Sequence, residues 1–378
     1  MDIIAFKAGK QLKGYNYQYF MPEYINHAFI WQDAELNELL EQAALKAGEL
    51  NAFAQQVPDA AMFIKMHVFK EAVVSSRIEG TQTHMEEALL NKKDIRPERK
   101  DDWQEVNNYV QAMDHALKEL NKLPLSNRLF RQLHVILMKS VRGEKKTPGE
   151  FRISQNWIGG ASLADAVFVP PAHEHVPDLM ADLEKFIHNT DIKVPRLVKA
   201  AIAHYQFETI HPFLDGNGRL GRLLITLYLV DTKVMDKPLL YLSDFFDRNK
   251  QLYYDNLMGV CHKNDLRQWV LFFLVAVKET AEKAAATLQE IIRMKGKLEK
   301  TFVLGMGRRA ASAQLLLDSF FAEPVVTSKS AAGELDLTPK ATNKLIEDFV
   351  TAGILKEITG LQRGRVYTFH NYIDLFEK

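Results

Sequence analysis

Cysteine is almost absent from this sequence, which has a single one, Cys261, among 378 residues. A lone cysteine excludes an internal disulfide and a cysteine-based zinc site, and we expect it to be a small buried apolar residue. An excess of charge is also missing, because Lys and Arg together number 48, as do Asp and Glu. The balance removes any global electrostatic argument for binding to nucleic acid or to an anionic membrane.

Long apolar runs are absent as well. The longest extends from Trp269 to Val277 and has nine residues, whereas a transmembrane helix needs about 20. The first residues, Met1 to Ile4, lack the basic region and apolar stretch of a signal peptide. We therefore expect a soluble protein of the cytoplasm that does not bind membranes.

What the sequence does contain is helical periodicity, with apolar residues recurring at intervals of three and four. Asp33 precedes the first of these segments as an N-cap residue. A length of 378 residues suggests roughly two to three domains, and the pattern predicts that they are mainly α-helical. The segments with this pattern are residues 33–56, 60–79, 103–120, 129–141, 197–207, 220–228 and 267–298.

The segment from His211 to Arg222 combines reactive side chains with a glycine-rich turn; it reads His-Pro-Phe-Leu-Asp-Gly-Asn-Gly-Arg-Leu-Gly-Arg. One predicted helix, residues 197–207, precedes it, and another, residues 220–228, follows it. The glycines therefore lie in a tight loop at a helix N-terminus, where unpaired backbone N–H groups and the helix dipole favour an anion. A chain of phosphates would fit there.

The side chains of this segment suit phosphoryl or nucleotidyl transfer. Arg219 and Arg222 lie three residues apart on one helical face and can donate to the same anion. Asp215 offers the oxygen ligand that Mg2+ accepts beside nucleotide phosphates, and His211 can take up a proton near neutral pH. The alternative is that residues 215–218 form only a turn that requires positive φ angles.

The segment resembles the signature of Fic-domain proteins, His-x-Phe-x-(Asp/Glu)-Gly-Asn-Gly-Arg-x-x-Arg, at all eight specified positions. The resemblance implies a protein adenylyltransferase that uses ATP as substrate and Mg2+ as cofactor. His211 would deprotonate a Ser, Thr or Tyr hydroxyl of a target protein, or of the chain itself, for attack on the α-phosphate, and Asp215 would hold the Mg2+. The residues that would contact the nucleotide here are Gly216, Asn217, Gly218, Arg219, Leu220, Gly221 and Arg222.

A second motif lies at the end of the predicted helix 60–79, where Gly80 is suited to the position after the helix. Glu79 then faces the negative end of the helix dipole, which favours either an arginine partner or weak pairing with Arg77 in solvent. The segment also resembles the inhibitory motif (Ser/Thr)-x-x-x-Glu-(Gly/Asn) of Fic proteins, filled by Ser75, Glu79 and Gly80. The resemblance implies that Glu79 pairs with Arg222 and hinders binding of the γ-phosphate of ATP.

Residues 151–158 and 167–169 have the composition of two short strands, and Gly159-Gly160 supplies a turn signal between them. Such a hairpin buries little surface by itself, so it could be a surface ornament. In Fic proteins, however, a hairpin in this place is a flap that binds the target segment by strand addition, which uses main-chain hydrogen bonds. The resemblance therefore implies a flap.

Asn249, Tyr253 and Tyr254 follow the signature helix at a distance. The tyrosine pair resembles the element of Fic proteins that closes over the adenosine, where an aromatic face and an amide could bind the ribose or the base. The alternative is a pair of core aromatic residues.

The last part of the chain has a different pattern. Residues 313–321, 328–335 and 338–346 are predicted helices, with Pro339 in the first turn of the third, and residues 354–369 predict a hairpin. Helices followed by a hairpin resemble a winged helix-turn-helix, a fold that often binds DNA. From Lys300 to Lys378 there are 10 Lys and Arg against 9 Asp and Glu, a net charge of +1, which is weak for DNA. Docking of a protein, or pairing into a homodimer, is an equal alternative.

The combined prediction is a mainly α protein with a Fic-type helical bundle, a small hairpin flap and a C-terminal winged helix. The predicted boundaries are 1–58 for an N-terminal helical extension, 59–298 for the catalytic domain and 299–378 for the winged helix. The predicted activity is transfer of AMP from ATP to protein hydroxyl groups. One alternative is the reverse hydrolysis of AMP from a modified protein, and another is a nucleotide-sensing transcriptional regulator.

Overall fold

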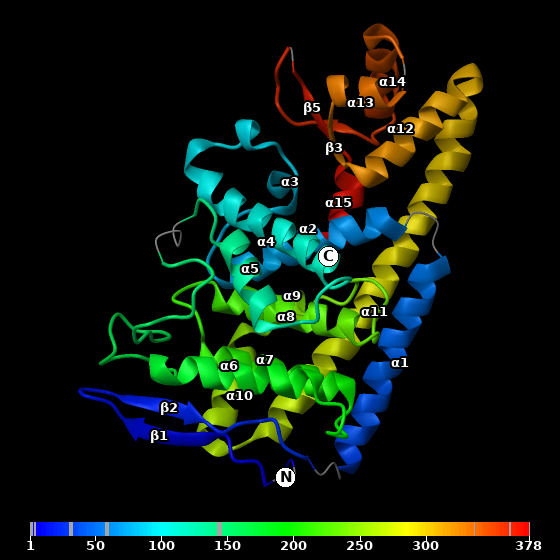
Figure 1. Ribbon diagram of the computed structural model, residues 1–378. Helices are drawn as coiled ribbons and strands as arrows, with labels where there is room; N and C mark the ends of the chain where they lie inside the picture. Colours follow the sequence, from blue (N-terminus) through cyan, green and yellow to red (C-terminus); the bar gives the residue numbers. More distant parts are fainter. Residues whose placement is uncertain are drawn as a thin grey trace.

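The computed structural model describes residues 3, 5–29, 33–56, 60–141, 146–335, 337–362 and 364–377. Most of these residues lie in helices, and the prediction of a mainly α fold is confirmed (Figure 1). The helices are α1 (Ala34–Gln56), α2 (Ala60–Ile78), α3 (Met85–Ala88), α4 (Lys100–Glu119), α5 (Asn127–Leu137), α6 (Val176–His188), α7 (Arg196–Ile210), α8 (Asn217–Asp231), α9 (Ser243–Arg248), α10 (Lys250–Lys263), α11 (Leu266–Leu298), α12 (Ala310–Ala322), α13 (Ser328–Leu335), α14 (Pro339–Thr351) and α15 (His370–Glu377). The strands are β1 (Gly9–Lys13), β2 (Gln18–Pro22), β3 (Val325–Thr327), β4 (Lys356–Glu357) and β5 (Val366–Thr368).

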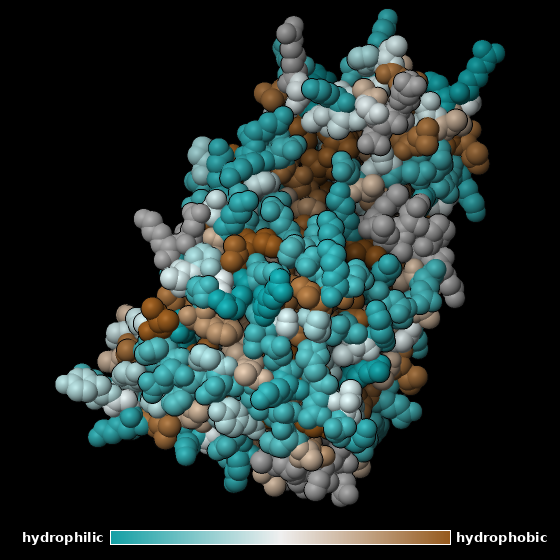
Figure 2. Space-filling model, in the orientation of Figure 1, coloured by the Kyte–Doolittle hydropathy of each residue, from teal (hydrophilic) through white to brown (hydrophobic). Residues whose placement is uncertain are grey.

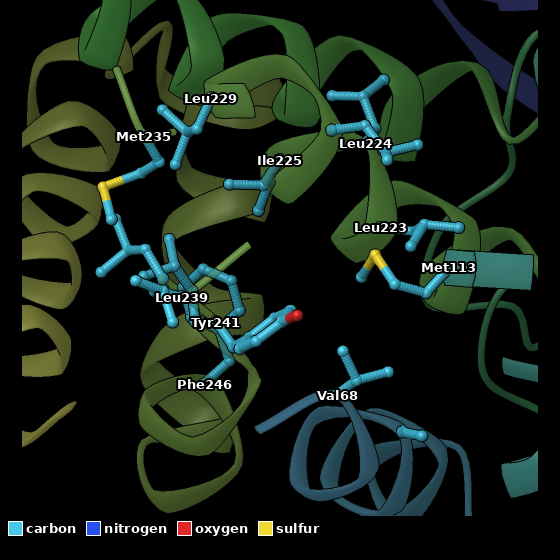
Figure 3. Packing of buried hydrophobic residues seen from close by; sticks show 14 of the residues in the cluster. Val68, Met113, Leu223, Leu224, Ile225, Leu229, Met235, Leu239, Tyr241 and Phe246 are labelled. Carbon is cyan, nitrogen blue, oxygen red and sulfur yellow. The ribbon is translucent and has the colours of Figure 1, made fainter. Parts of the chain in front are cut away.

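Helix α8 lies in the core of the bundle. Its leucines predict one apolar stripe, but residues between them, such as Ile225, are apolar and buried too. Figure 3 shows Leu223 of α8 facing Met113 of α4, with Val68 of α2 below them. A helix that is apolar on all sides packs on all sides. The loop that precedes α8, residues 211–216, is therefore attached to a rigid element.

Helix α2 packs against α4, α8 and α9. It ends at Ile78, one residue earlier than the sequence predicts, and Gly80 has a φ of 105°, the left-handed region expected for a glycine after a helix. Nζ of Lys250 donates to the carbonyl of Ile78 at 2.7 Å. The position of Glu79 is therefore fixed by the helix before it and by the glycine after it.

The longest helix, α11, runs along one side of the bundle with α1 beside it (Figure 1). Asp33 caps α1 as predicted, because its Oδ1 accepts the N–H of Leu36 at 2.9 Å. Its Oδ2 also accepts from Nε of Arg267 at the start of α11, at 2.6 Å. One carboxylate therefore begins α1 and connects it to α11.

The C-terminal region contains the three helices and the hairpin that the sequence predicts. Oγ1 of Thr338 accepts the N–H of Ala341 at 3.3 Å, and Pro339 lies in the first turn of α14. Strand β3 and helix α15 are not predicted by the sequence pattern; β3 joins the hairpin in a sheet with the order β3-β5-β4. The assignment of this region to the winged-helix fold stays a prediction.

Helix α15 connects the C-terminal region to α2. The ring of Phe376 lies 6.2 Å from the ring of Phe63 and 5.1 Å from that of His67, measured between centroids. All three side chains are buried. The C-terminal region therefore contacts the same helix that leads to Glu79.

The predicted domain boundaries stay predictions. The boundary between residues 58 and 59 lies outside the described residues. The boundary after residue 298 coincides with the end of α11, but the chain continues there without a gap. A π-helical turn (Glu299–Val303) and a 3-10 segment (Leu304–Arg309) lead directly into α12.

Two segments without apolar periodicity contain regular structure. Near the N-terminus, β1 and β2 form an antiparallel hairpin in which Gly9 lies opposite Pro22. In the charged segment 92–102, two 3-10 turns (Lys92–Asp94 and Pro97–Arg99) lead into α4 at Lys100. Charged residues form these turns because the side chains stay in solvent while the backbone closes local hydrogen bonds.

The prediction of two strands at residues 151–158 and 167–169 is wrong, although the predicted turn at Gly159 and Gly160 is present, with positive φ angles. Only one bridge forms, between Ile158 and Phe168. The carboxylate of Asp165 accepts the N–H groups of residues 161 and 162 at 2.8 and 2.7 Å. These side-chain bonds replace the ladder that a longer hairpin would form.

The surface agrees with a chain that has no long apolar helix. Figure 2 shows a mostly hydrophilic face on which apolar side chains gather in a recess below the C-terminal region. No helix within the described ranges combines the length and the apolar character that crossing a membrane requires. The expected cytoplasmic location stays a prediction.

His67 gives a prediction for stability. Burial, and the neighbouring Lys70 cation, lower the pKa of His67 from 6.5 to about 3. The unfolded chain therefore binds a proton before the folded chain does. The contribution of His67 to stability should be fully present above pH 6.5. Below that pH, the free energy of unfolding should fall toward pH 3 by up to about 1.4 kcal/mol per pH unit from this residue.

Urea unfolding at pH 7.5 and pH 5 checks this. The fall between the two should be smaller in His67→Gln than in the native chain, and unchanged in His262→Gln, which alters an exposed histidine. An equally steep fall in His67→Gln would contradict the prediction.

Candidate active site

Two residues with left-handed backbone shape the turn between α7 and α8. His211 ends α7 with φ 51° and ψ 60°, and Gly216 precedes α8 with φ 73°. The left-handed region costs a residue other than glycine about 1–2 kcal/mol, so His211 requires bonds that fix it. Its N–H donates to the carbonyl of Phe207 at 3.0 Å, and its carbonyl accepts from Nε of Arg152 at 2.9 Å.

Asn217 stabilises the turn from inside. Its Oδ1 accepts the N–H of Phe213 at 2.9 Å, and its Nδ2 donates to the carbonyl of the same residue at 2.8 Å. The amide is therefore used in shaping the loop. What the turn presents to a ligand is the start of α8, where the first backbone N–H groups and the helix dipole favour an anion.

A cavity of about 380 Å³ opens beside this turn, within the size range of small-molecule sites. His211 lies on its wall, next to Gly218 and Arg222 of α8 and to Glu79. Residues around the bridge between Ile158 and Phe168 form another part of the wall. The remaining wall consists of Glu208, Thr209 and seven residues of α10, namely Gln251, Tyr253, Tyr254, Asp255, Leu257, Met258 and Cys261.

The imidazole of His211 is held in its neutral form. Burial, together with the neighbouring Arg152 cation, lowers the pKa of His211 from 6.5 to about 4. A neutral imidazole can accept a proton at physiological pH, which a protonated one cannot. The residue is therefore ready to act as a general base without any change in the protein.

Arg222 binds both polar residues of the predicted inhibitory motif. Its Nη2 lies 2.7 Å from Oε1 of Glu79, and its Nε donates to Oγ of Ser75 at 2.9 Å. The guanidinium is buried, whereas the side chain of Glu79 keeps 36% of its surface exposed. Although burial opposes ionisation, Arg222 lowers the pKa of Glu79. The pairing implied by the sequence resemblance is therefore present, and the alternative partner Arg77 is not used.

Glu79 also touches the first turn of α8. A Cβ atom on Gly218 would lie 2.2 Å from Oε1 of Glu79 and 3.0 Å from Nη1 of Arg222. Only a residue without a side chain leaves room for the carboxylate at this point. The Glu79 carboxylate thus occupies part of the place where the N-terminus of α8 would accept an anionic ligand.

Asp215 is the predicted Mg2+ ligand, and its surroundings fit that role. Its Oδ1 accepts the N–H of Gly216 at 2.7 Å, and its Oδ2 pairs with Nζ of Lys146 at 2.9 Å. Both Asp215 and Lys146 are partly exposed, so a cation could take the place of the lysine. Within the described ranges no group of three or more acidic, His or Cys side chains could hold a metal. A cation at Asp215 would therefore need ligand phosphates as well, which is usual for Mg2+.

Other predicted nucleotide contacts lie elsewhere. Nη1 of Arg219 pairs with Oε2 of Glu105 at 3.0 Å, and both side chains are buried away from the cavity wall. Leu220 is a core residue. Gly221 packs against Glu208, whose Oε1 would lie 2.1 Å from a Cβ at this position. These residues support the site rather than line it.

The residues predicted for adenosine divide in the same way. Tyr254 is 38% exposed and lines the cavity. Tyr253 reaches the cavity as well, but it is a core residue whose hydroxyl lies 2.9 Å from Nε2 of His204. Nδ2 of Asn249 donates to the carbonyl of Phe245 on the preceding helix and does not reach the cavity wall.

Glu208 is a site residue that the sequence interpretation missed. Burial, and the Glu79 carboxylate, raise the pKa of Glu208 to about 8, although Arg222 opposes this. The cavity therefore contains a carboxyl group that is largely protonated at neutral pH. A sequence signal existed, because Glu208 lies three residues before His211, one turn back along the same helix.

His134 of α5 is a second missed residue. Its Nδ1 accepts the N–H of Gly149 at 2.8 Å, so the proton of the neutral ring is on Nε2, which donates to the carbonyl of Asp215 at 3.0 Å. The ring also stacks on Phe213 with centroids 4.0 Å apart. Burial lowers the pKa of His134 to about 4, which keeps this arrangement neutral. Nothing in the local sequence connects His134 to a turn about 80 residues away.

Family comparisons agree with this geometry. Residues 37–118 match the model of the Fic/DOC family N-terminal region, and residues 124–229 match the model of the Fic/DOC family. The second match contains the whole turn between α7 and α8, and the first contains Ser75 and Glu79. Both halves of the contact at Arg222 therefore lie within the matched parts.

Individual relatives give the same result. The chain is 31% identical over 180 residues to the protein adenylyltransferase Fic of Aedes aegypti, and 28% identical over 181 residues to that of Drosophila erecta. The alignments cover 46% of this chain and 33% of each relative, so the chain spans about a third of their length.

A solved Fic family protein from Desulfovibrio desulfuricans has a similar fold, with a TM-score of 0.59 at 21% identity, over 91% of this chain and 98% of that one. Fic-1 from Caenorhabditis elegans has a TM-score of 0.51 at 19% identity, over 68% and 74%. At these identities the likeness concerns the fold.

The neutral state of His211 can be measured directly. In NMR spectra of the protein labelled at histidine, the His211 signal, assigned by its loss in His211→Ala, should titrate with a midpoint near pH 4 and stay unchanged between pH 6 and 8. Titration near the ordinary value of about 6.5 would show that the imidazole is not held neutral by its surroundings.

Proposed function

Since the chain belongs to the Fic/DOC family through residues 37–118 and 124–229, we propose that it is a protein adenylyltransferase. It transfers AMP from ATP to a hydroxyl side chain of a protein. The proposal depends on one observation. A neutral base, His211, and an anion-binding element, the start of α8, line the same cavity of about 380 Å³.

The reaction follows from the positions of these groups. The acceptor hydroxyl gives its proton to His211 while its oxygen attacks the α-phosphorus of ATP. A new P–O bond forms, the bond to the β-phosphate breaks, and pyrophosphate leaves with the electron pair. The phosphates lie against Gly216 to Gly218, where the helix N-terminus stabilises the charge that develops on them, and Arg222 adds a charge-assisted donor.

Asp215 would hold a Mg2+ ion together with phosphate oxygens of ATP. The ion supplies neutralisation of phosphate charge when it is bound. Lys146, which now pairs with Asp215, would then be able to contact solvent or phosphate.

The acceptor approaches from the side of residues 151–169. Ile153 and Val167 are 81% and 66% exposed there, and apolar side chains on an exposed segment suit contact with another chain. Ser, Thr and Tyr all carry the hydroxyl group that the reaction needs. A segment of the chain itself is a second acceptor, because it is present at high effective concentration.

Glu79 restrains this activity. Its carboxylate occupies the guanidinium of Arg222 and the space beside Gly218, both of which the terminal phosphates of ATP would need. The negative charge also repels phosphate. Removing the side chain leaves Arg222 with Ser75 as its remaining partner and gives the nucleotide access to the start of α8.

The activity test uses ATP labelled at the α-phosphate with Mg2+. Glu79→Gly should transfer at least about tenfold more label to protein than the native chain, since one buried charge-assisted contact is worth roughly 1.5–3 kcal/mol. Glu79→Gly combined with His211→Ala should transfer none.

Label in that double variant would remove His211 from the role of base. No label in any sample would contradict AMP transfer. Release of AMP from a protein already carrying it, only when Glu79 is intact, would favour the reverse hydrolysis instead.

The same contact predicts a change in stability. Glu79→Gly leaves the buried Arg222 without its anion, which should lower the free energy of unfolding by about 1–3 kcal/mol. Breaking a fully buried pair costs about 3–5 kcal/mol, and the expected loss is smaller here because Glu79 is partly exposed. ATP with Mg2+ should then raise the melting temperature more in Glu79→Gly than in the native chain.

Differential scanning fluorimetry with and without ATP measures both effects. Glu35→Gly, which removes an exposed carboxylate paired with Arg267, is the control and should respond to ATP like the native chain. An equal response to ATP in Glu79→Gly and native protein would contradict the occupation of the phosphate site by Glu79.

A further inference from the structure

We infer that Arg152 is a positioning residue for His211, and that it joins the segment on which the acceptor is bound to the turn that carries the base. The inference deepens the proposed function and rests on it, because that function gives His211 its role. Arg152 belongs to none of the sequence motifs that indicated the site.

Arg152 binds three successive carbonyl groups of the catalytic turn. Its Nη2 donates to Ile210 at 3.3 Å, its Nε to His211 at 2.9 Å, and its backbone N–H to Pro212 at 2.9 Å. His211 is the non-glycine residue with left-handed backbone in this turn. The donors of Arg152 therefore lie on a stretch of chain whose conformation needs external support.

The same side chain also binds both ends of the segment that faces the acceptor. Its Nη1 donates to the carbonyl of Ser154 at 3.2 Å, and its Nη2 to the carbonyl of Pro171 at 2.5 Å. Ser154 and Pro171 flank the bridge between Ile158 and Phe168. A displacement of this segment would therefore alter the bonds that fix the backbone of His211.

A buried arginine at this position lowers stability unless its bonds offset the cost of burying the charge. Arg152 is 2% exposed, and among the described residues no carboxylate pairs with it, although a buried unpaired cation usually costs several kcal/mol. Only a guanidinium offers N–H donors in a fixed planar fork that can reach four carbonyls at once. A lysine in its place would keep the charge but lose most of these bonds.

The charge itself has a second effect. A cation beside His211 disfavours the imidazolium form, and with burial it lowers the pKa of His211. Arg152 thus acts on the base in two separable ways, through the geometry of its backbone and through its protonation. Substitutions can distinguish the two, because lysine retains the charge whereas glutamine retains neither the charge nor the full fork.

The experiment uses the full chain with Glu79→Gly as parent and adds Arg152→Gln, Arg152→Lys or Arg131→Gln. Arg131 is the matched control, because it donates to the carbonyl of Gly149 in the same region but touches no residue of the turn. In each variant, kcat and the KM for ATP are measured with α-labelled ATP. The midpoint of the His211 titration is measured by NMR.

In Arg152→Gln we expect kcat to fall by about 10–100-fold, the size of effect that a small misplacement of a catalytic group produces. The KM for ATP should stay within about threefold of the parent, because the loss concerns the chemical step and not the binding of ATP. The His211 midpoint should rise toward its ordinary value. Arg152→Lys should lower kcat but keep the midpoint close to that of the parent, and Arg131→Gln should match the parent in every respect.

An unchanged kcat in either Arg152 variant would overturn the inference. So would equal losses in kcat and ATP affinity with an unmoved midpoint in Arg152→Gln, the result expected of a merely structural residue. If Arg152→Gln does not fold, Arg152→Lys decides through kcat. Absence of AMP transfer in the parent would refute the proposed function instead, and the NMR midpoints would still report whether Arg152 acts on His211.

Discussion

The contact between Arg222 and the pair Ser75 and Glu79 is the interaction on which the arrangement of the site depends. It joins the first turns of α8 to the end of α2, across about 140 residues of sequence. Neither helix could be moved without exposing a buried guanidinium or leaving it unpaired, and both are costly. The packing of α8 on all sides and the glycine after α2 fix the two ends of this contact, so that the carboxylate lies against Gly218 rather than in solvent.

Around this contact the protein keeps most titratable groups in the form that suits phosphate chemistry. His211 and His134 are neutral because burial disfavours their protonation, and Glu208 is protonated because burial disfavours its ionisation. Arg222 and Glu79 face each other on the cavity wall, with Asp255 on the same wall and the partly exposed Asp215 in the adjoining turn. Glu79 lies against Gly218 in the first turn of α8, so under the proposed function its carboxylate would oppose an anionic nucleotide at that point.

The C-terminal region is part of the same structure through its contact with α2. Phe376 of α15 packs against Phe63 and His67 near the start of α2, and Glu79 follows the other end of that helix. The C-terminal region and Glu79 therefore lie at opposite ends of the same helix.

The sequence by itself determined the features that depend on neighbouring residues. The ends of α1 and α2, the left-handed Gly80, the turn before α8 and the residue types of the catalytic segment all follow from local spacing and backbone preference, and the structure contains them. The family signature added the pairing of Glu79 with Arg222. Its assignments of Arg219 and Asn217 to the nucleotide stay predictions; in the structure Arg219 is paired with Glu105 and Asn217 with its own loop.

Only the tertiary structure decided which distant groups meet. Arg152 and His134 act on the turn through contacts made by folding. In place of the hairpin expected at residues 151–169, the side chains of Asp165, Arg152 and Asn156 bind backbone groups. A buried polar group must find a partner wherever the fold supplies one, and sequence spacing does not say where that is. Local preference therefore fixed the chemistry available to this protein, and long-range packing fixed which of those groups face the cavity.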